Sequence, residues 1–176
     1  MMDFSNIEYL KSGDKKQIET YEILIQNNIL SKLKAFDPIL VGTIPINIDI
    51  KKSDLDIICY WKDKTNFIKK LQSSFRNENE FTIREILIDN HESVIANFKI
   101  SDFEIEIFGQ NIPTKEQNGY KHMIIEYEIL KSKGKNFRLE IIKLKQNGYK
   151  TEPAFGLLLG LKGDPYLELL KYAHKS

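Results

Sequence analysis

Two aspartates set two residues apart in an otherwise apolar segment constrain this chain more than any other feature. The segment reads Ser53-Asp54-Leu55-Asp56-Ile57-Ile58-Cys59-Tyr60. Aspartate is depleted in strands, and a buried carboxylate without a partner is costly. In a strand, alternate side chains share a face, so both carboxylates would emerge on one side, about 6.5 to 7 Å apart at the backbone. The pattern predicts a strand over 53–60 whose acids serve a chemical purpose.

Carboxylates with this spacing can converge on one hard cation or bridge two. Mg²⁺ prefers a few carboxylates together with water and phosphate oxygens, and a pair of such ions neutralises the attacking and leaving oxygens of phosphoryl-type transfer. An isolated Asp-x-Asp is more often the plain solvent face of a strand, because short motifs match by chance. The surroundings of the pair must decide between these two interpretations.

A possible phosphate-binding turn precedes the aspartates. The apolar run Ile39-Leu40-Val41 ends in Gly42-Thr43, and ten residues lie between Thr43 and Asp54. Glycine permits a tight turn and the close approach of a phosphate to the backbone, and Thr43 adds a hydroxyl. Taken alone, Gly-Thr is better explained as an ordinary turn at the end of a strand.

A second acidic strand is predicted further along the chain. In 103–108, Phe103, Ile105 and Ile107 alternate with Glu104, Glu106 and Phe108. Alternation of this kind places apolar side chains on one face and the two glutamates on the other. The acidic face is either solvated or part of a site.

Together, these motifs resemble the signature of the DNA polymerase beta-like nucleotidyltransferase superfamily. In that superfamily a Gly-Ser or Gly-Gly pair holds the nucleotide phosphates, and the following Asp-x-Asp or Asp-x-Glu binds two magnesium ions. The resemblance implies that Gly42 and Thr43 seat phosphates and that Asp54 and Asp56 are catalytic metal ligands. It also implies a third carboxylate on a later strand, which helps to deprotonate an acceptor hydroxyl.

Glu106 and Glu104 are the two candidates for that third acid. Glu106 is favoured, also as a metal ligand, because it lies nearer the middle of the apolar alternation, but both stay open. The resemblance further implies groups near the triphosphate, for which Ser53 and Lys150 are the nucleotide-binding candidates. The basic residues considered in the C-terminal part are Lys121, Arg138, Lys143 and Lys150.

The chain departs from the superfamily pattern in two places. The arginine and glycine that often follow the Gly-Ser pair are replaced by Ile44-Pro45-Ile46-Asn47, which removes a cation that would help to hold triphosphate. The third acid would be a glutamate, which is longer than the usual aspartate and shifts the position of the base.

A narrower resemblance covers nearly the whole chain. The segments 39–45, 103–109 and 150–155 look like a small bacterial domain-of-unknown-function family, family 4269, related to these transferases. The stretch Thr43-Ile44-Pro45 is also similar to the GrpB-like branch of the superfamily. Both resemblances imply a fold without an established substrate.

Periodicity predicts an α+β fold: a nucleotidyltransferase-like mixed β-sheet with flanking helices and a helical C-terminal part. Apolar residues recur at helical spacing over 15–34 and 65–75, and further strands are expected over 81–88 and 93–100. Helices are expected over 117–131 and 137–145, and over a last stretch that starts with Thr151 as N-cap. We expect one domain over residues 1–176, with a core of about 15–110, a C-terminal part of about 117–174, and the helices gathered on one side.

The composition restricts the class of protein. Lys and Arg total 26 against 25 acidic residues, so a net charge of +1 gives no global attraction for nucleic acid or membrane. The single cysteine, Cys59, lies in an apolar run, which fits a buried thiol in the cytoplasm, and no apolar run approaches the ~20 residues of a membrane span. His122 fits a proton shuttle or phosphate donor but is more often simply packed, and three histidines with one cysteine do not assemble a structural zinc site.

The sequence thus predicts a nucleotidyltransferase that uses Mg²⁺ or Mn²⁺ and moves a nucleotidyl group from a nucleoside triphosphate to a hydroxyl of an unknown acceptor. A small-molecule acceptor fits the neutral charge better than long nucleic acid. The alternative is a catalytically silent module of the same fold that binds a nucleotide or a partner protein, because fold does not settle function. A third possibility is one half of a toxin–antitoxin type pair, which is supported only by the small size and the superfamily resemblance.

Overall fold

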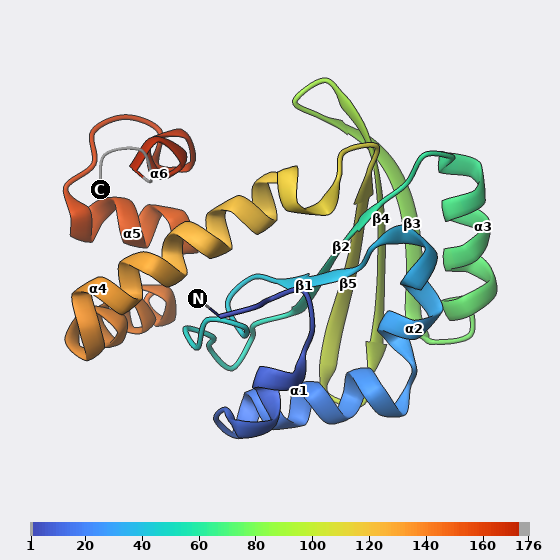
Figure 1. Ribbon diagram of the computed structural model, residues 1–176, viewed down its shortest axis with the longest axis horizontal. Helices are drawn as coiled ribbons and strands as arrows, with labels where there is room; N and C mark the ends of the chain where they lie inside the picture. Colours follow the sequence, from blue (N-terminus) through green and yellow to red (C-terminus); the bar gives the residue numbers. More distant parts are fainter. Residues whose placement is uncertain (1, 173–176) are drawn as a thin grey trace.

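A five-stranded mixed sheet forms the centre of the computed structural model, which describes residues 2–172 (Figure 1). The strand order is β1-β2-β5-β4-β3; β2 and β5 are parallel, and the other neighbouring pairs are antiparallel. The strands are β1 (Ile39–Val41), β2 (Leu55–Tyr60), β3 (Asn79–Ile88), β4 (His91–Ile100) and β5 (Phe103–Gln110). The helices are α1 (Lys15–Gln26), α2 (Ile29–Leu33), α3 (Lys64–Phe75), α4 (Asn118–Gln146), α5 (Thr151–Leu159) and α6 (Pro165–Tyr172), with short 3₁₀ turns η1 (Glu8–Ser12), η2 (Lys34–Phe36) and η3 (Thr114–Glu116). This architecture confirms the predicted fold class. Residue 1 and residues 173–176, at the end of the expected C-terminal part, lie outside the described residues.

The first predicted helix is divided in two. Asp14 caps α1 by accepting a hydrogen bond from the backbone N–H of Gln17, whose side chain accepts in return from the Asp14 N–H. This reciprocal arrangement fixes the start of a helix. Asn28 then adopts a left-handed conformation, with φ of 54°, and separates α1 from α2. The prediction of one continuous helix over 15–34 is therefore wrong at that residue, because side-chain periodicity does not report a local backbone reversal.

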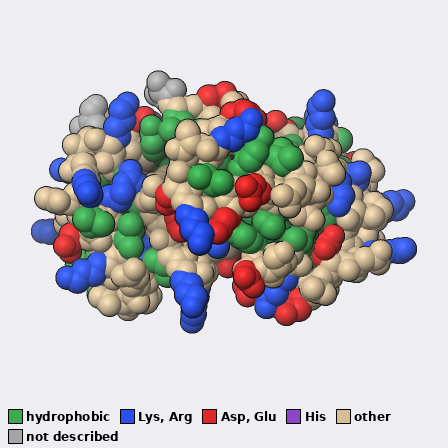
Figure 2. Space-filling view, turned by 90° about the horizontal axis from the view of Figure 1, so that it is seen from below, with side chains coloured by type: hydrophobic (Ala, Val, Ile, Leu, Met, Phe, Trp, Pro, Cys, Tyr) green, Lys and Arg blue, Asp and Glu red, His purple; other side chains and the backbone are tan. Residues whose placement is uncertain are grey.

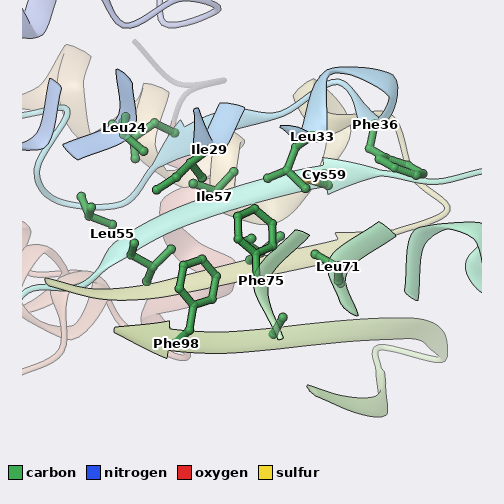
Figure 3. Packing of buried hydrophobic residues seen from close by; sticks show 14 of the residues in the cluster. Leu24, Ile29, Leu33, Phe36, Leu55, Ile57, Cys59, Leu71, Phe75 and Phe98 are labelled. Carbon is green, nitrogen blue, oxygen red and sulfur yellow. The ribbon is translucent and has the colours of Figure 1, made fainter. Parts of the chain in front are cut away.

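One face of the sheet packs against α1, α2 and α3. Leu55, Ile57 and Cys59 point from β2 into this core, where they meet side chains such as Leu24 and Leu33 (Figure 3). Cys59 is fully buried, as predicted, and burial raises the pKa of its thiol. Because side chains alternate between the two faces of a strand, the odd-numbered residues of β2 all face this core.

The opposite face packs against the C-terminal helices. Ile39, Val41 and Ile58 belong to a second buried cluster with side chains of α4, α5 and α6. At Gly119 an added Cβ would lie 3.6 Å from Ile58, so α4 runs close over β1 and β2. The expectation that the helices gather on one side is wrong, because both faces of β1 and β2 are apolar and each needs a covering layer.

The C-terminal helices match the prediction at one point and differ at another. Gly134 lies between the two helices predicted over 117–131 and 137–145, and its non-helical backbone, with φ of 80° and ψ of −167°, kinks α4 there and interrupts its helical geometry. Thr151 is not the N-cap of α5: Lys150 occupies that position without a side-chain capping bond, and Thr151 is the first helical residue. Ser and Thr are favoured N-caps, but the position is decided here by where the chain turns after Gly148.

The surface carries charges of both signs. In the view from below, acidic and basic side chains are interspersed with small apolar areas (Figure 2). Within residues 2–172, no helix is both long enough and apolar enough to span a bilayer.

Candidate functional site

A cleft of about 340 Å³ lies between the sheet and the C-terminal helices. Its floor is formed by the ends of β1, β2 and β5, and its opposite wall by α4 and the start of α5. Asp56, Glu106, Gly42 and Thr43 all line it. Four of the residues singled out from the sequence are thus brought into one cavity.

The two acidic strands meet at Asp56. Because β2 and β5 are parallel neighbours, Asp56 is the register partner of Glu106, and on its other side Asp56 pairs with Val41 of β1. Side chains of register partners lie on the same face of a sheet. The Asp56 and Glu106 carboxylates therefore stand side by side on the cleft-facing surface.

Gly42 packs directly against Asp56. Its φ is 84°, in the region that favours glycine, and a Cβ at this position would lie 2.3 Å from Asp56 Oδ2. Only a residue without a side chain fits between the end of β1 and this carboxylate. The glycine of the predicted phosphate-binding turn is thus required by the geometry of the acidic site.

Clustering of acids changes the protonation of the aspartates. Burial raises the pKa of Asp56 to about 7, and the negative charges of Glu106 and Asp54 add to the effect. Asp54 lies just before β2 and is exposed; burial of part of its carboxyl, followed by Glu104 and Glu106, raises its pKa, while Lys150 opposes the shift. Carboxyl groups therefore gather where the sequence predicted a metal, and burial together with their mutual repulsion raises the pKa of both aspartates.

The two candidate third acids have different surroundings. Glu106 is partly buried, accepts a hydrogen bond of 3.2 Å from Asn97 Nδ2, and lies 3.9 Å from Arg84. Glu104 is exposed, does not line the main cleft, and forms an ion pair of 3.4 Å with Lys99. Glu106 lines the main cleft with Asp56 and also a smaller depression that it shares with Glu104 and Asp54, so Glu106 is the glutamate that borders both.

The hydroxyls of Thr43 and Ser53 hold the intervening loop closed. Thr43 Oγ1 lies 3.2 Å from Ser53 Oγ, to which it donates, and Ser53 Oγ also accepts from the backbone N–H of Ile50 at 2.9 Å. The same two side chains that were predicted to meet phosphate thus join the two ends of segment 43–53.

Side chains from both layers of helices bind the backbone of this loop. Gln17 Nε2 donates to the carbonyls of Ile44 and Pro45, at 2.9 and 3.3 Å. The guanidinium of Arg138 donates to the carbonyls of Ile46 and Asn47, and Lys145 Nζ donates to that of Ile48 at 2.8 Å. Every carbonyl from 44 to 48 has a side-chain donor, so the loop beside Gly42 is firmly held despite its irregular backbone.

Comparison of the sequence with family models gives one match. Residues 22–172 match the family described as Domain of unknown function (DUF4269). The chain belongs to this family. No protein of curated function matches the DUF4269 chain significantly.

Several solved structures that are similar to the DUF4269 chain are described as polymerases. The Cid1 poly(U) polymerase bound to Mg and 3'-dATP superposes with a TM-score of 0.53 at 13% identity, over 76% of this chain and 41% of that one. Its H336N mutant bound to MgATP gives 0.56 at 12% identity, over 84% and 49%. The polymerase core of TRAMP, an RNA surveillance complex, gives 0.53 at 15% identity, over 93% and 50%. These likenesses show that the DUF4269 chain has the nucleotidyltransferase fold, although it spans half or less of those chains.

Further functional candidates lie in or beside the cleft of the DUF4269 chain; the sequence had indicated His122 but not Lys145, Glu126 or Glu152. Lys145 is buried, and burial lowers its pKa to about 8, against the opposing effect of Glu126 and of other acids around it. His122 and Glu152 line the cleft with Glu126. A Glu or Lys on a helical face is usually solvated, so only the packing of α4 and α5 over the sheet reveals these residues.

The other predicted basic residues lie in different places. Lys150 is exposed at the start of α5, and it lies near enough to Asp54 for its charge to oppose the rise in the pKa of Asp54. Arg138 is engaged by the loop carbonyls. Lys121 and Lys143 are exposed and do not line the cleft. Of these four, Lys150 is the one placed beside the acidic site.

Proposed function

We propose that this protein is a magnesium-dependent nucleotidyltransferase that moves a nucleotidyl group from a nucleoside triphosphate to a hydroxyl of an acceptor. The observation that carries the proposal is the placement of Asp56 beside Glu106, directly against Gly42, on the floor of one cleft. The similar Cid1 structures are described as bound to Mg and 3'-dATP, to MgATP and to a UTP analogue, which supports the same ligand class here.

The residues present fit a hard divalent cation. Asp56 and Glu106 supply carboxylate oxygens from the neighbouring strands β2 and β5, and Asp54 adds a carboxylate just before β2; burial together with mutual repulsion raises the pKa of Asp56 to about 7. A bound cation would relieve that repulsion, and carboxylates are the ligands that Mg²⁺ and Mn²⁺ accept. Magnesium held by these residues would neutralise charge on the attacking and leaving oxygens.

Glu106 is suited to receive the proton of the acceptor hydroxyl. The hydroxyl oxygen would form a bond to the α-phosphorus, pyrophosphate would leave, and the hydroxyl proton would pass to the Glu106 carboxylate. Asn97 donates a hydrogen bond to the Glu106 carboxylate and Arg84 lies 3.9 Å from it, so both side chains orient this group. Glu104, held by Lys99, is the less favoured candidate.

The phosphate side of the site is assembled from several elements. Gly42 leaves its backbone accessible at the end of β1, Thr43 and Ser53 place hydroxyls beside it, and Lys150 provides a cation from the start of α5. Arg138 stands at the loop where the superfamily often has an arginine, but it binds carbonyls. We infer that triphosphate is held by backbone and hydroxyl groups with Lys150.

A silent nucleotide- or protein-binding module is the second candidate. It is favoured by the engagement of Arg138, which leaves the triphosphate fewer cations than in the superfamily pattern. The limited volume of the cleft, about 340 Å³, favours a small-molecule acceptor over long nucleic acid in the transferase alternative. The GrpB-like similarity stays a prediction from 43–45, and the single-domain organisation stays a proposal.

Calorimetric titration separates the two candidates. ATP, CTP, GTP and UTP are titrated with Mg²⁺ into the wild type and into the Asp54→Asn, Asp56→Asn double variant. The transferase predicts that at least one triphosphate binds more tightly to the wild type, and that labelled nucleotide is then transferred into a component of a cell extract. Binding without transfer supports the silent module, and equal binding to both proteins contradicts the metal site.

A further inference from the structure

A second group of potential ligands lies on the helical wall of the cleft. His122 and Glu126 are one helical turn apart on α4, and Glu152 lies in the first turn of α5. Ligand atoms of the three side chains all lie within 4.8 Å of one another. Residues four apart share a face of a helix, so α4 presents an imidazole and a carboxylate together, and α5 completes a three-sided pocket.

Two members of the group, His122 and Glu126, are buried and each has a polar atom without a hydrogen-bond partner. Glu126 is 3% exposed and its Oε1 has no hydrogen-bond partner; His122 is 8% exposed and its Nδ1 has none. A buried carboxylate without a partner is costly, and such a group in a native fold calls for a ligand or ion. Lys145, whose charge acts on Glu126, donates a hydrogen bond to the Ile48 carbonyl.

We propose that His122, Glu126 and Glu152 bind a borderline divalent cation, of which Zn²⁺ is the best match. One imidazole nitrogen with two carboxylates suits Zn²⁺ better than Mg²⁺, which favours oxygen ligands alone. All three side chains line the cleft, so a remaining coordination position faces the space that a substrate would enter.

This site differs from the acidic site in both chemistry and origin. The acidic site is built from strand carboxylates of β2 and β5, whereas this group comes from α4 and α5 and contains the imidazole. The sequence argument against a structural zinc site considered only histidine and cysteine as ligands, whereas two of the three ligands proposed here are glutamates. The third ligand, Glu152, belongs to no sequence motif and reaches the group only because α5 packs against α4.

Zinc titration with matched variants tests the proposal independently of any transferase activity. Calorimetry with Zn²⁺ should show about one equivalent bound to the wild type, and the affinity should fall at least about tenfold in His122→Ala and in Glu126→Gln. The Asp54→Asn, Asp56→Asn variant should retain this binding, as should His91→Ala, which removes an exposed histidine at the β3–β4 hairpin. Failure of nucleotide binding in the double variant would bear only on the acidic site.

Cobalt provides a spectroscopic reading of the same site. Co²⁺ added to the wild type should give visible absorption bands of a low-coordinate nitrogen-containing site, lost in His122→Ala and kept in the double aspartate variant. Zinc affinity unchanged in the His122 and Glu126 variants, or lost only in the double aspartate variant, would overturn the proposal. Glu126→Gln preserves the shape of the side chain and removes its carboxylate as a ligand, so this variant decides the matter if His122→Ala does not fold.

Discussion

Asp56 and Glu106 face each other in register across the parallel strands β2 and β5. Each is the second residue of an acidic pair, Asp54 with Asp56 and Glu104 with Glu106. The register brings Asp56 and Glu106 together at the cleft, while Asp54 and Glu104 remain exposed. The pairing of β2 with β5 therefore determines which two of the four carboxylates lie side by side in the cleft.

Glu106 and Glu104 form a matched pair of variants that tests this arrangement. In Glu106→Gln, metal-dependent triphosphate affinity should fall at least about tenfold, or ~1.4 kcal/mol, because the carboxylate beside Asp56 is lost. In Glu104→Gln it should stay within about twofold, since Glu104 is paired with Lys99. The measurement is calorimetric titration with Mg²⁺, and equal losses in both variants would show that register does not select the ligand.

Gly42→Ala should destabilise the fold more than another glycine substitution of similar backbone strain. Gly42 and Gly160 have φ of 84° and 65°, but an added Cβ meets Asp56 Oδ2 at 2.3 Å in the first and nothing within 4 Å in the second. Both variants carry left-handed strain, so the clash adds about 1–3 kcal/mol only at Gly42. Urea denaturation of both variants gives the difference; similar losses would contradict the close packing of Gly42 on Asp56.

Stability of the metal-free protein should depend on pH through Asp56. Burial and neighbouring acids raise its pKa to about 7, against about 3.9 in an unfolded chain. Between these values the folded state binds more protons than the unfolded state, so the contribution of Asp56 to stability falls as pH rises, by at most about 4 kcal/mol.

Asp56→Asn removes that titration and isolates the effect from other groups. The variant should resemble the wild type near pH 4 and become progressively more stable than it towards pH 8, as measured by urea denaturation in the presence of a chelator. A constant difference between the two proteins across this range would show that the Asp56 carboxyl titrates normally.

Lys145→Met should lower stability more than Lys143→Met on the same helix. Lys145 is buried, donates to the Ile48 carbonyl, and offsets the charges of Glu126, Asp49 and Asp56. Removing one cation from a buried charged group costs about 3 kcal/mol, whereas an exposed lysine such as Lys143 changes stability by about 0.5 kcal/mol or less. Thermal and urea unfolding compare the two; equal effects would mean that Lys145 stabilises neither the loop nor the acids.

Local pattern determined the elements and the chemical type of the acidic site. Period-2 alternation identified β5 and placed Glu104 and Glu106 opposite its apolar face, and the motif around Gly42 and Asp56 indicated the fold that the structure and its relatives show. These features depend on neighbours in the chain, so they are readable from the sequence. The break at Asn28 was missed because apolar spacing continues through it.

Tertiary structure alone decided which distant residues meet. The parallel pairing of β2 with β5 selected Glu106 for the cleft, and the packing of α4 and α5 over the sheet buried Lys145, His122 and Glu126 beside it. On a helix these three side chains look like ordinary solvated or packed residues. Their burial, and hence their charge, unsatisfied atoms and ligand-binding capacity, arises only when the second layer covers the strands.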